Sequence, residues 1–257
     1  MHPVLFSFGP VTLYTYGAMM VAAFLTATLL AAHVARRLPA DQRPMNPERV
    51  VDFSSVILLG GLAGGRLFFI LLHWDEFVPS PWEALALWHG GLVWYGGFVG
   101  GLAGAWLYVR AQRLNMLRVL DFYVPFLALG HAIGRIGCFF NGCCYGKPAD
   151  SWCGVTFPGQ NVRVIPTQLI EAICLAVLFL LLRSLQRPSV LKCSGRVFGA
   201  YLVGYAVIRF VVESLRGDQV VWVAGLTLQQ VISLSVLLSG LLLVKKMAVP
   251  KSDSHQK

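Results

Sequence analysis

Charged residues are scarce in this sequence. They make up 13% of the 257 residues, whereas a soluble domain carries about 25%. Hydrophobic residues make up 56% and lie in recurring runs, and a membrane-spanning helix needs roughly 20 mostly apolar residues. Seven such stretches can be drawn, at about 11–35, 51–73, 84–109, 117–137, 165–183, 197–213 and 221–244. The composition predicts an all-α polytopic membrane protein with about seven transmembrane helices.

Lysine and arginine are absent from the first ten residues, Met1 to Pro10. The apolar run that follows is longer than the h-region of a cleavable signal peptide, which is also preceded by positive charge. We interpret this first stretch as a retained helix.

The formal net charge of +9 does not indicate a nucleic-acid partner, because most of the positive charge follows the loops between the predicted helices. Four basic loops or tails alternate with segments poor in Lys and Arg, and the loop with Asp75, Glu76 and Glu83 has neither. This alternation is the positive-inside pattern, so we expect the N-terminus outside and the C-terminus inside. The basic loop and tail residues are Arg36, Arg37, Arg43, Arg49, Arg110, Arg113, Arg118, Arg183, Arg187, Lys192, Arg196, Lys245, Lys246, Lys251 and Lys257.

The topology leaves six basic residues unexplained, and these are Arg66, Arg135, Lys147, Arg163, Arg209 and Arg216. Charged residues inside membrane helices are rare and usually face a polar cavity and a partner. One partner is local, since Arg209 and Glu213 are four residues apart and share a helix face. A structural ion pair would explain that pair alone. A convergent group of arginines instead favours a phosphate ligand, because the guanidinium fork matches phosphate bidentately.

Two further segments break the apolar pattern. Double glycines flank Tyr95 in the run 90–97, and we expect a broken or re-entrant turn there, which membranes tolerate where it lines a cavity. Gly100, Gly101 and Gly104 favour close packing of helices instead. Residues 131–146 carry His131 and Arg135 before a glycine-rich, polar stretch. If the helix continues this far, His131 and Arg135 share a face.

These segments together resemble the prolipoprotein diacylglyceryl transferase family. Residues 134–146 read GRIGCFFNGCCYG, close to the family signature G-R-x-G-N-F-x-N-x-E-x-x-G. The likeness runs in order along nearly the whole chain. Its other landmarks are Tyr16-Gly17, Gly65-Arg66, Asp121-Phe122 with Pro125, Pro166-Thr167-Gln168-Leu169 with Glu171, the Arg209/Glu213/Arg216 set, and Thr227 with Gln230 and Ser233.

Four positions depart from the family pattern. Tyr95 stands where the family often has a His proposed as catalytic, and Ile165 replaces the His of an H-P-S-Q motif. Cys138 replaces a frequent Asn, and Cys143 replaces an acidic residue. Arg135 and Arg209 match the family pattern, whereas the histidine expected to act as the base is absent.

The resemblance implies a donor and an acceptor. Phosphatidylglycerol would give its diacylglyceryl group to the thiol of the lipobox cysteine in a prolipoprotein signal peptide, with release of glycerol phosphate and no cofactor. Charge grows on the departing phosphate, so preplaced cations are the natural catalysts. We expect Arg135 and Arg209 in this role, with Tyr95 and His131 as proton acceptors for the thiol. The implied substrate-binding residues are Tyr16, Arg66, Asn141, Gly146, Gln168, Glu171, Glu213 and Arg216.

The six cysteines allow more than one interpretation. Cys174 and Cys193 are expected to be inert or reduced, whereas Cys138, Cys143, Cys144 and Cys153 cluster in the sequence at the outer face, where a disulfide is possible. A zinc site is a weaker option, since no C-x-x-C spacing occurs, and we assign no metal ligands. A membrane thiol oxidoreductase would use such cysteines.

Two more functions are compatible with the sequence. The chain could be a small lipid or anion transporter, although many transporters contain internal repeats and this sequence shows none. It could also be a divergent family member that acts on another acceptor. We predict one transmembrane transferase domain over residues 1–257, with a basic cytoplasmic tail at 245–257. The expected location is the bacterial inner membrane, as a multi-pass protein.

Overall fold

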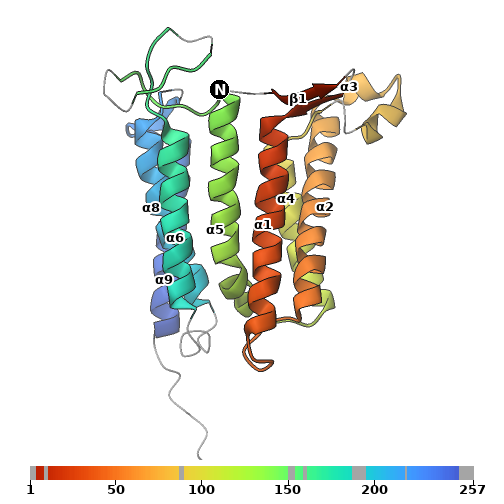
Figure 1. The fold of residues 1–257 in the computed structure, drawn as a ribbon, viewed down its shortest axis with the longest axis vertical. Helices are drawn as coiled ribbons and strands as arrows, with labels where there is room; N and C mark the ends of the chain where they lie inside the picture. Colours follow the sequence, from red (N-terminus) through yellow and green to blue (C-terminus); the bar gives the residue numbers. More distant parts are fainter. Residues whose placement is uncertain are drawn as a thin grey trace, which may run out of the picture. The chain divides into compact units, whose positions relative to one another are not determined.

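The computed structural model describes residues 4–8, 11–86, 90–149, 154–158, 161–186, 195–217 and 219–248 (Figure 1). It divides into two compact units. One comprises residues 1–30 and 120–257, and the other comprises residues 31–119, so that the boundaries fall within helices α1 and α5. The prediction of a single domain stays a prediction.

The first unit contains four membrane-length helices besides the start of α1. They are α5 (Met116–Asn141), α6 (Thr167–Leu185), α8 (Arg196–Leu215) and α9 (Leu228–Ala248). Two short antiparallel hairpins precede α1 (Thr15–Arg37) and α9. Their strands are β1 (Val4–Phe8), β2 (Val11–Tyr14), β3 (Val221–Val223) and β4 (Leu226–Thr227).

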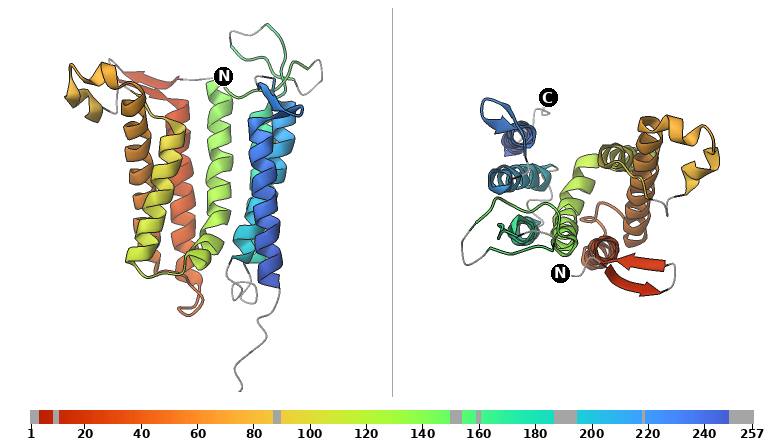
Figure 2. Two further views of the ribbon diagram at one scale, coloured as in Figure 1. Left: turned by 180° about the vertical axis from the view of Figure 1, so that it is seen from behind. Right: turned by 90° about the horizontal axis from the view of Figure 1, so that it is seen from above.

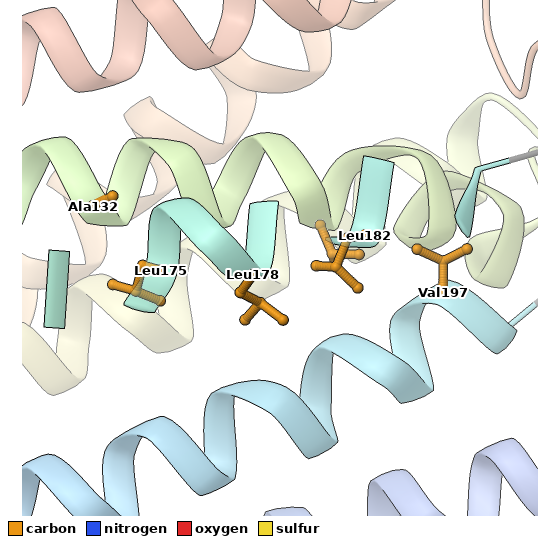
Figure 3. Close-up of a cluster of buried hydrophobic side chains, with 6 residues drawn as sticks. Ala132, Leu175, Leu178, Leu182 and Val197 are labelled. Atoms are coloured by element: carbon orange, nitrogen blue, oxygen red, sulfur yellow. The ribbon is translucent and has the colours of Figure 1, made fainter. Parts of the chain in front are cut away.

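The core of the first unit lies where α5, α6 and α8 meet. Leu175 and Leu182 of α6 are almost fully buried, and they cluster with Ala132 of α5 and Val197 of α8 (Figure 3). α8 lies between α6 and α9 (Figure 2). Buried Asp121 of α5 accepts hydrogen bonds from the backbone N–H groups of Gly195 and Phe198 at the start of α8. This carboxylate satisfies donors that a helix N-terminus leaves unpaired.

The second unit is built around the packing of α2 (Pro47–Leu72) against α4 (Trp94–Ala111). The helices are antiparallel and meet through glycines, with Gly60 facing Gly100 and Gly64 facing Gly96. A Cβ added at Gly100 would lie 2.2 Å from the carbonyl oxygen of Gly60. Small residues at such a crossing let membrane helices approach closely, as expected for Gly100 and Gly104. The short helix α3 (Trp74–Phe77) and the 3-10 turn η1 (Pro81–Leu85) connect α2 to α4.

The all-α polytopic class is confirmed, because each of the seven predicted stretches contains a helix. Six of these helices, α1, α2, α5, α6, α8 and α9, are long and apolar enough to cross a membrane. α4 has 18 residues and is rich in glycine and aromatic residues.

Several predicted boundaries were wrong. Residues 11–14 and 221–227 contain strands rather than helix, and α4 begins at Trp94 rather than near residue 84. The predicted break lies at Gly90 and Gly91, whose φ angles are +80° and +79°. Gly96 and Gly97, the second glycine pair beside Tyr95, are helical instead.

We predict that Gly100→Ala lowers the stability of the second unit by about 1–3 kcal/mol, the usual cost of overpacking. The new methyl group would meet backbone atoms of α2, which cannot rotate away. Gly17→Ala is the matched control, because nothing lies within 4 Å of a Cβ at that helical position. Thermal unfolding in detergent measures both variants. Equal midpoints would contradict the close packing of α2 against α4.

Candidate functional site

The centre of the candidate site is the carboxylate of Glu171, on the second turn of α6. Its side chain is 2% exposed. Arg135 of α5 places Nη2 2.9 Å from Oε1, and Arg209 of α8 places Nη1 3.6 Å from Oε2. His131 lies one turn before Arg135 on α5, with Nε2 3.9 Å from Oε1 of Glu171. α5 continues to Asn141, so His131 and Arg135 share a helix face as predicted, and Glu171 joins three helices.

A second carboxylate holds Arg209 from the other side. Glu213 is fully buried, and its Oε2 lies 3.0 Å from Nη2 of Arg209, as the spacing of four predicted. Thr227 donates its hydroxyl hydrogen to Oε1 of Glu213. Thr227 also forms a reciprocal pair of hydrogen bonds with Gln230, a capping box at the start of α9. The cap of α9 thereby extends the charged cluster to a fourth helix.

Both arginines retain buried N–H groups without a hydrogen-bond acceptor among the described residues. These atoms are Nε of Arg135 and Nη1 of Arg209, and the amide oxygen of Gln168 is likewise unpaired. Nη1 of Arg209 is close enough to Glu171 for an ion pair, although it forms no hydrogen bond with it. An unpaired buried donor is costly, so these two N–H groups are available to a ligand with acceptor oxygens.

The charged cluster lies close to the ends of its helices. Arg135 is six residues before the end of α5, Arg209 is six residues before the end of α8, and Glu171 is four residues after the start of α6. At 1.5 Å per residue, these distances are about 6–9 Å. The cluster therefore lies nearer to one end of each helix than to its middle.

The segment that follows α5 is hydrogen-bonded to the start of α6 and to the residues at the end of α8. Buried Gln168 and Thr167 donate hydrogen bonds to the carbonyl oxygens of Cys143 and Cys144, respectively. Gly146 forms a bridge with Arg216 and donates its N–H to the carbonyl of Ile165. A Cβ at Gly146 would lie 2.7 Å from the carbonyl oxygen of Leu215, so only glycine fits. Gln168, Gly146 and Arg216 thus lie together near the cluster, and their contact with substrate stays a prediction.

Two other predicted substrate-binding residues, Tyr16 and Asn141, form no hydrogen bond or ion pair with the charged cluster among the described residues. Tyr16 of α1 packs near Gly137, where a Cβ would lie 3.5 Å from its ring. Asn141 is the last residue of α5 and is exposed. Their roles stay predictions.

The cysteines of the signature are free thiols. Cys138, Cys143 and Cys144 place their sulfur atoms within 4.8 Å of one another. Hydrogen bonds with the Cys138 and Cys143 thiols, followed by the positive charges of Arg216 and Arg135, lower the pKa of the Cys144 thiol. Cys174 is also free, whereas Cys153 and Cys193 lie outside the described residues. The possible disulfide is not formed among the cysteines that the structure describes.

Arg66 belongs to the second unit, and its surroundings differ from those of the other arginines. All its N–H groups point at backbone carbonyls: Nε at Ala84, Nη1 at Gly90 and Gly91, and Nη2 at Glu83 and Ala86. The guanidinium also lies over the rings of Phe69 and Phe77. Arg66 therefore ties residues 83–86 and the break at Gly90 and Gly91 to α2, and its substrate contact stays a prediction.

Tyr95 lies on the first turn of α4, also in the second unit. It is 58% exposed, and its ring packs edge-on against Trp94. Its proposed role as a proton acceptor stays a prediction.

Sequence reasoning missed part of the network around the two carboxylates. Ser214 accepts a hydrogen bond from the amide of Gln230, and the ring centroid of Tyr205 lies 5.7 Å from that of His131. The spacing Thr227-x-x-Gln230 carried a readable signal, since it is the pattern of a capping box. Tyr205 carried none, because an aromatic residue in a membrane helix is ordinary.

The fold and the cluster together define a class. The chain is a multi-pass membrane protein in which two arginines, held by carboxylates, retain buried N–H groups without a hydrogen-bond acceptor among the described residues. The family model for prolipoprotein diacylglyceryl transferase matches residues 3–245. The chain therefore belongs to the prolipoprotein diacylglyceryl transferase family.

Three relatives carry the name phosphatidylglycerol–prolipoprotein diacylglyceryl transferase. The one from Clostridium tetani is 36% identical over 248 residues, which cover 94% of this chain and 96% of the relative. The one from Legionella pneumophila strain Corby is 34% identical, covering 93% of this chain and 94% of the relative. The one from Synechococcus elongatus is 31% identical, covering 93% and 85%.

We predict that Arg66→Lys locally loosens residues 83–86 and 90–91. An ammonium group has only three donors and lacks the planar fork, so it cannot bond all five carbonyls. Losing even one hydrogen bond to a charged group costs about 1.5–3 kcal/mol. Hydrogen–deuterium exchange at the amides of Glu83, Ala86 and Val93 should therefore become at least about tenfold faster.

Arg110→Lys is the matched control, because Arg110 is exposed near the other end of α4 and stacks on Trp106. Exchange in Arg66→Lys that equals exchange in this control would show that the carbonyl contacts do not hold the segment.

Proposed function

We propose that this chain transfers the diacylglyceryl group of phosphatidylglycerol to the thiol of the lipobox cysteine in a prolipoprotein signal peptide. Membership of the family makes it a diacylglyceryl transferase that acts on prolipoproteins, and the names of the relatives supply the lipid donor. The observation that carries the chemical role is the pair of buried, unpaired N–H groups on Arg135 and Arg209.

The reaction needs a cation at the leaving group. The acceptor sulfur attacks the glyceryl carbon that bears the phosphate, a C–S bond forms and the C–O bond breaks. The electron pair of that bond leaves with glycerol phosphate, whose phosphate gains one negative charge. Donors fixed in advance stabilise that charge without reorganisation. Arg135 and Arg209 take this role in the proposal, and Gln168 at the start of α6 and Arg216 directly after α8 contact the head group.

The thiol proton also needs an acceptor, because the thiolate is the effective nucleophile. His131 and Glu171 are 3.9 Å apart. We assign the proton to this pair, in which His131 is the more exposed member and Glu171 is the buried one. Tyr95 remains the alternative acceptor from the second unit.

The proposed location is the bacterial inner membrane, with the N-terminus outside. Within the first unit, α6 and α9 end and α8 begins at the same end (Figure 1). Arg183, Arg196, Lys245 and Lys246 lie at that end, and Lys147, Arg163 and Arg216 lie towards the other. The residues of the first group fit the cytoplasmic side by the positive-inside rule.

The orientation predicts that reporter fusions after Arg43, Arg113 and Lys192 all report the cytoplasm. Each of these residues lies in a predicted loop that carries several Lys and Arg residues, which are retained on the inner side of the membrane. Paired alkaline phosphatase and fluorescent protein fusions give the measurement. An external signal from any one of these positions contradicts the proposed orientation.

We predict that Arg135→Ala and Arg209→Ala each lower turnover by about 100-fold or more, which is typical for loss of a preplaced transition-state donor. Lysine at either position should restore activity only in part, since it lacks the guanidinium fork. The assay is mass measurement of a lipobox peptide incubated with phosphatidylglycerol and the purified variant.

Arg196→Ala is the matched control, because Arg196 is exposed at the other end of the helix that carries Arg209. A folded alanine variant with near-normal transfer would remove that arginine from the phosphate site.

Replacing Cys138, Cys143, Cys144 and Cys153 separates the transferase from a thiol oxidoreductase. Transfer should persist in the folded fraction, since the reacting sulfur belongs to the acceptor, whereas a redox enzyme would lose all turnover.

A further inference from the structure

Three thiols converge where α5 ends. Cys138 lies on the last turn of the helix, and Cys143 and Cys144 follow directly after it. Their sulfur atoms all lie within 4.8 Å of one another. Gly142 has a φ of +73° and Cys144 a φ of +63°, so the chain turns back on the helix end. The N–H and the thiol of Cys143 both point at the carbonyl of Cys138.

The turn that brings the thiols together is fixed from outside. Gln168 donates to the carbonyl of Cys143 over 2.6 Å, and Thr167 donates to the carbonyl of Cys144 over 2.7 Å. Both donors are 1% exposed. A non-glycine residue with positive φ is uncommon and costs of the order of 1–3 kcal/mol, and such residues gather at functional sites. The three sulfur atoms are therefore held close by a built and locally strained structure.

We infer that Cys138, Cys143 and Cys144 bind one thiophilic metal ion, Cu⁺ or Zn²⁺. Thiolates are soft ligands that select Cu⁺ and Zn²⁺ over Mg²⁺, Ca²⁺ and Mn²⁺, which take oxygen ligands. Sulfur atoms about 2.3 Å from one ion in a trigonal arrangement are about 4 Å apart. A spacing of at most 4.8 Å needs only small rotations about the side-chain bonds to reach this value. On binding, the three thiols release their protons to water.

The two ions share this chemistry and differ in ligand number. Zinc is almost always four-coordinate, and with three protein ligands it keeps a water molecule in the fourth position. Cu⁺ is satisfied by three thiolates. The sequence pattern C-x4-C-C hid the site, because the helix end and the positive φ at Gly142 bring together residues that lack C-x-x-C spacing.

The metal site differs from the phosphate site in the residues that form it and in the measurement that detects it. Cys138 is one turn beyond Arg135 on α5, but the proposed transfer uses no sulfur of this chain. Metal binding can therefore be measured without any reaction, and failure of either proposal leaves the other to be judged on its own data.

The test is metal binding by the full chain, purified metal-free in detergent and kept reduced. Zn²⁺ and Cu⁺ are each added in the presence of a chromophoric chelator, and bound metal is counted by elemental mass spectrometry after desalting. We expect one ion per chain at this site, which the triple variant Cys138→Ser/Cys143→Ser/Cys144→Ser lacks. Each single Cys→Ser variant should bind at least about tenfold more weakly, since loss of an outer-shell partner alone costs 10–100-fold.

Cys174→Ser is the matched control, because Cys174 is a free thiol on α6 outside the cluster. A second measurement uses only the wild-type chain: the bound ion should protect Cys138, Cys143 and Cys144 together from alkylation, as mapped by peptide mass. Binding of either ion with these dependencies supports the site, and competition then ranks the two ions. Equal metal content in the wild type and the folded triple variant, or no joint protection, would overturn it.

Discussion

The ion-pair system around Glu171 is the interaction on which the first unit depends. One carboxylate from α6 holds a guanidinium from α5 and another from α8, and Glu213 completes the pairing of Arg209. Charges inside membrane helices are tolerated when they pair. Removing one member leaves the others buried and uncompensated, at a cost of about 3–5 kcal/mol. The same contacts therefore hold three helices in register and present the arginines to the proposed phosphate.

The sequence predicted the helices well and their ends poorly. Hydropathy counts apolar residues without regard to conformation, so the strands at 11–14 and 221–223 were read as parts of spans. Hydropathy also overlooked that η1 and the Gly90–Gly91 break precede α4, because apolar residues continue through both. α5, by contrast, continues to Asn141 despite Gly134 and Gly137. Isolated glycines weaken a helix by about 1 kcal/mol each, and close packing against Met19 of α1 at Gly137 offsets that cost.

Contacts within one helix were predictable, and contacts between helices were not. The Arg209–Glu213 pair follows from a spacing of four. The convergence of Arg135 and Arg209 on Glu171 depends on how three helices rotate about their axes, which their periodicity does not specify. Arg66 illustrates the difference, because the same reasoning that grouped it with the other arginines could not foresee that five backbone carbonyls of its own unit would surround it.

The charge balance of the cluster links phosphate binding to proton transfer. Arg135 and Arg209 are matched by Glu171 and Glu213, so the cluster has no formal excess of charge while His131 is neutral. A phosphodiester adds one negative charge, and breaking its C–O bond adds another. Taking the thiol proton onto His131 or Glu171 cancels one of these charges where they accumulate, and opposite charges in a weakly screened site stabilise each other strongly. In the proposed mechanism, proton acceptor and phosphate clamp therefore belong in one cluster, and Glu171, which touches both arginines and faces His131, is the residue through which they are coupled.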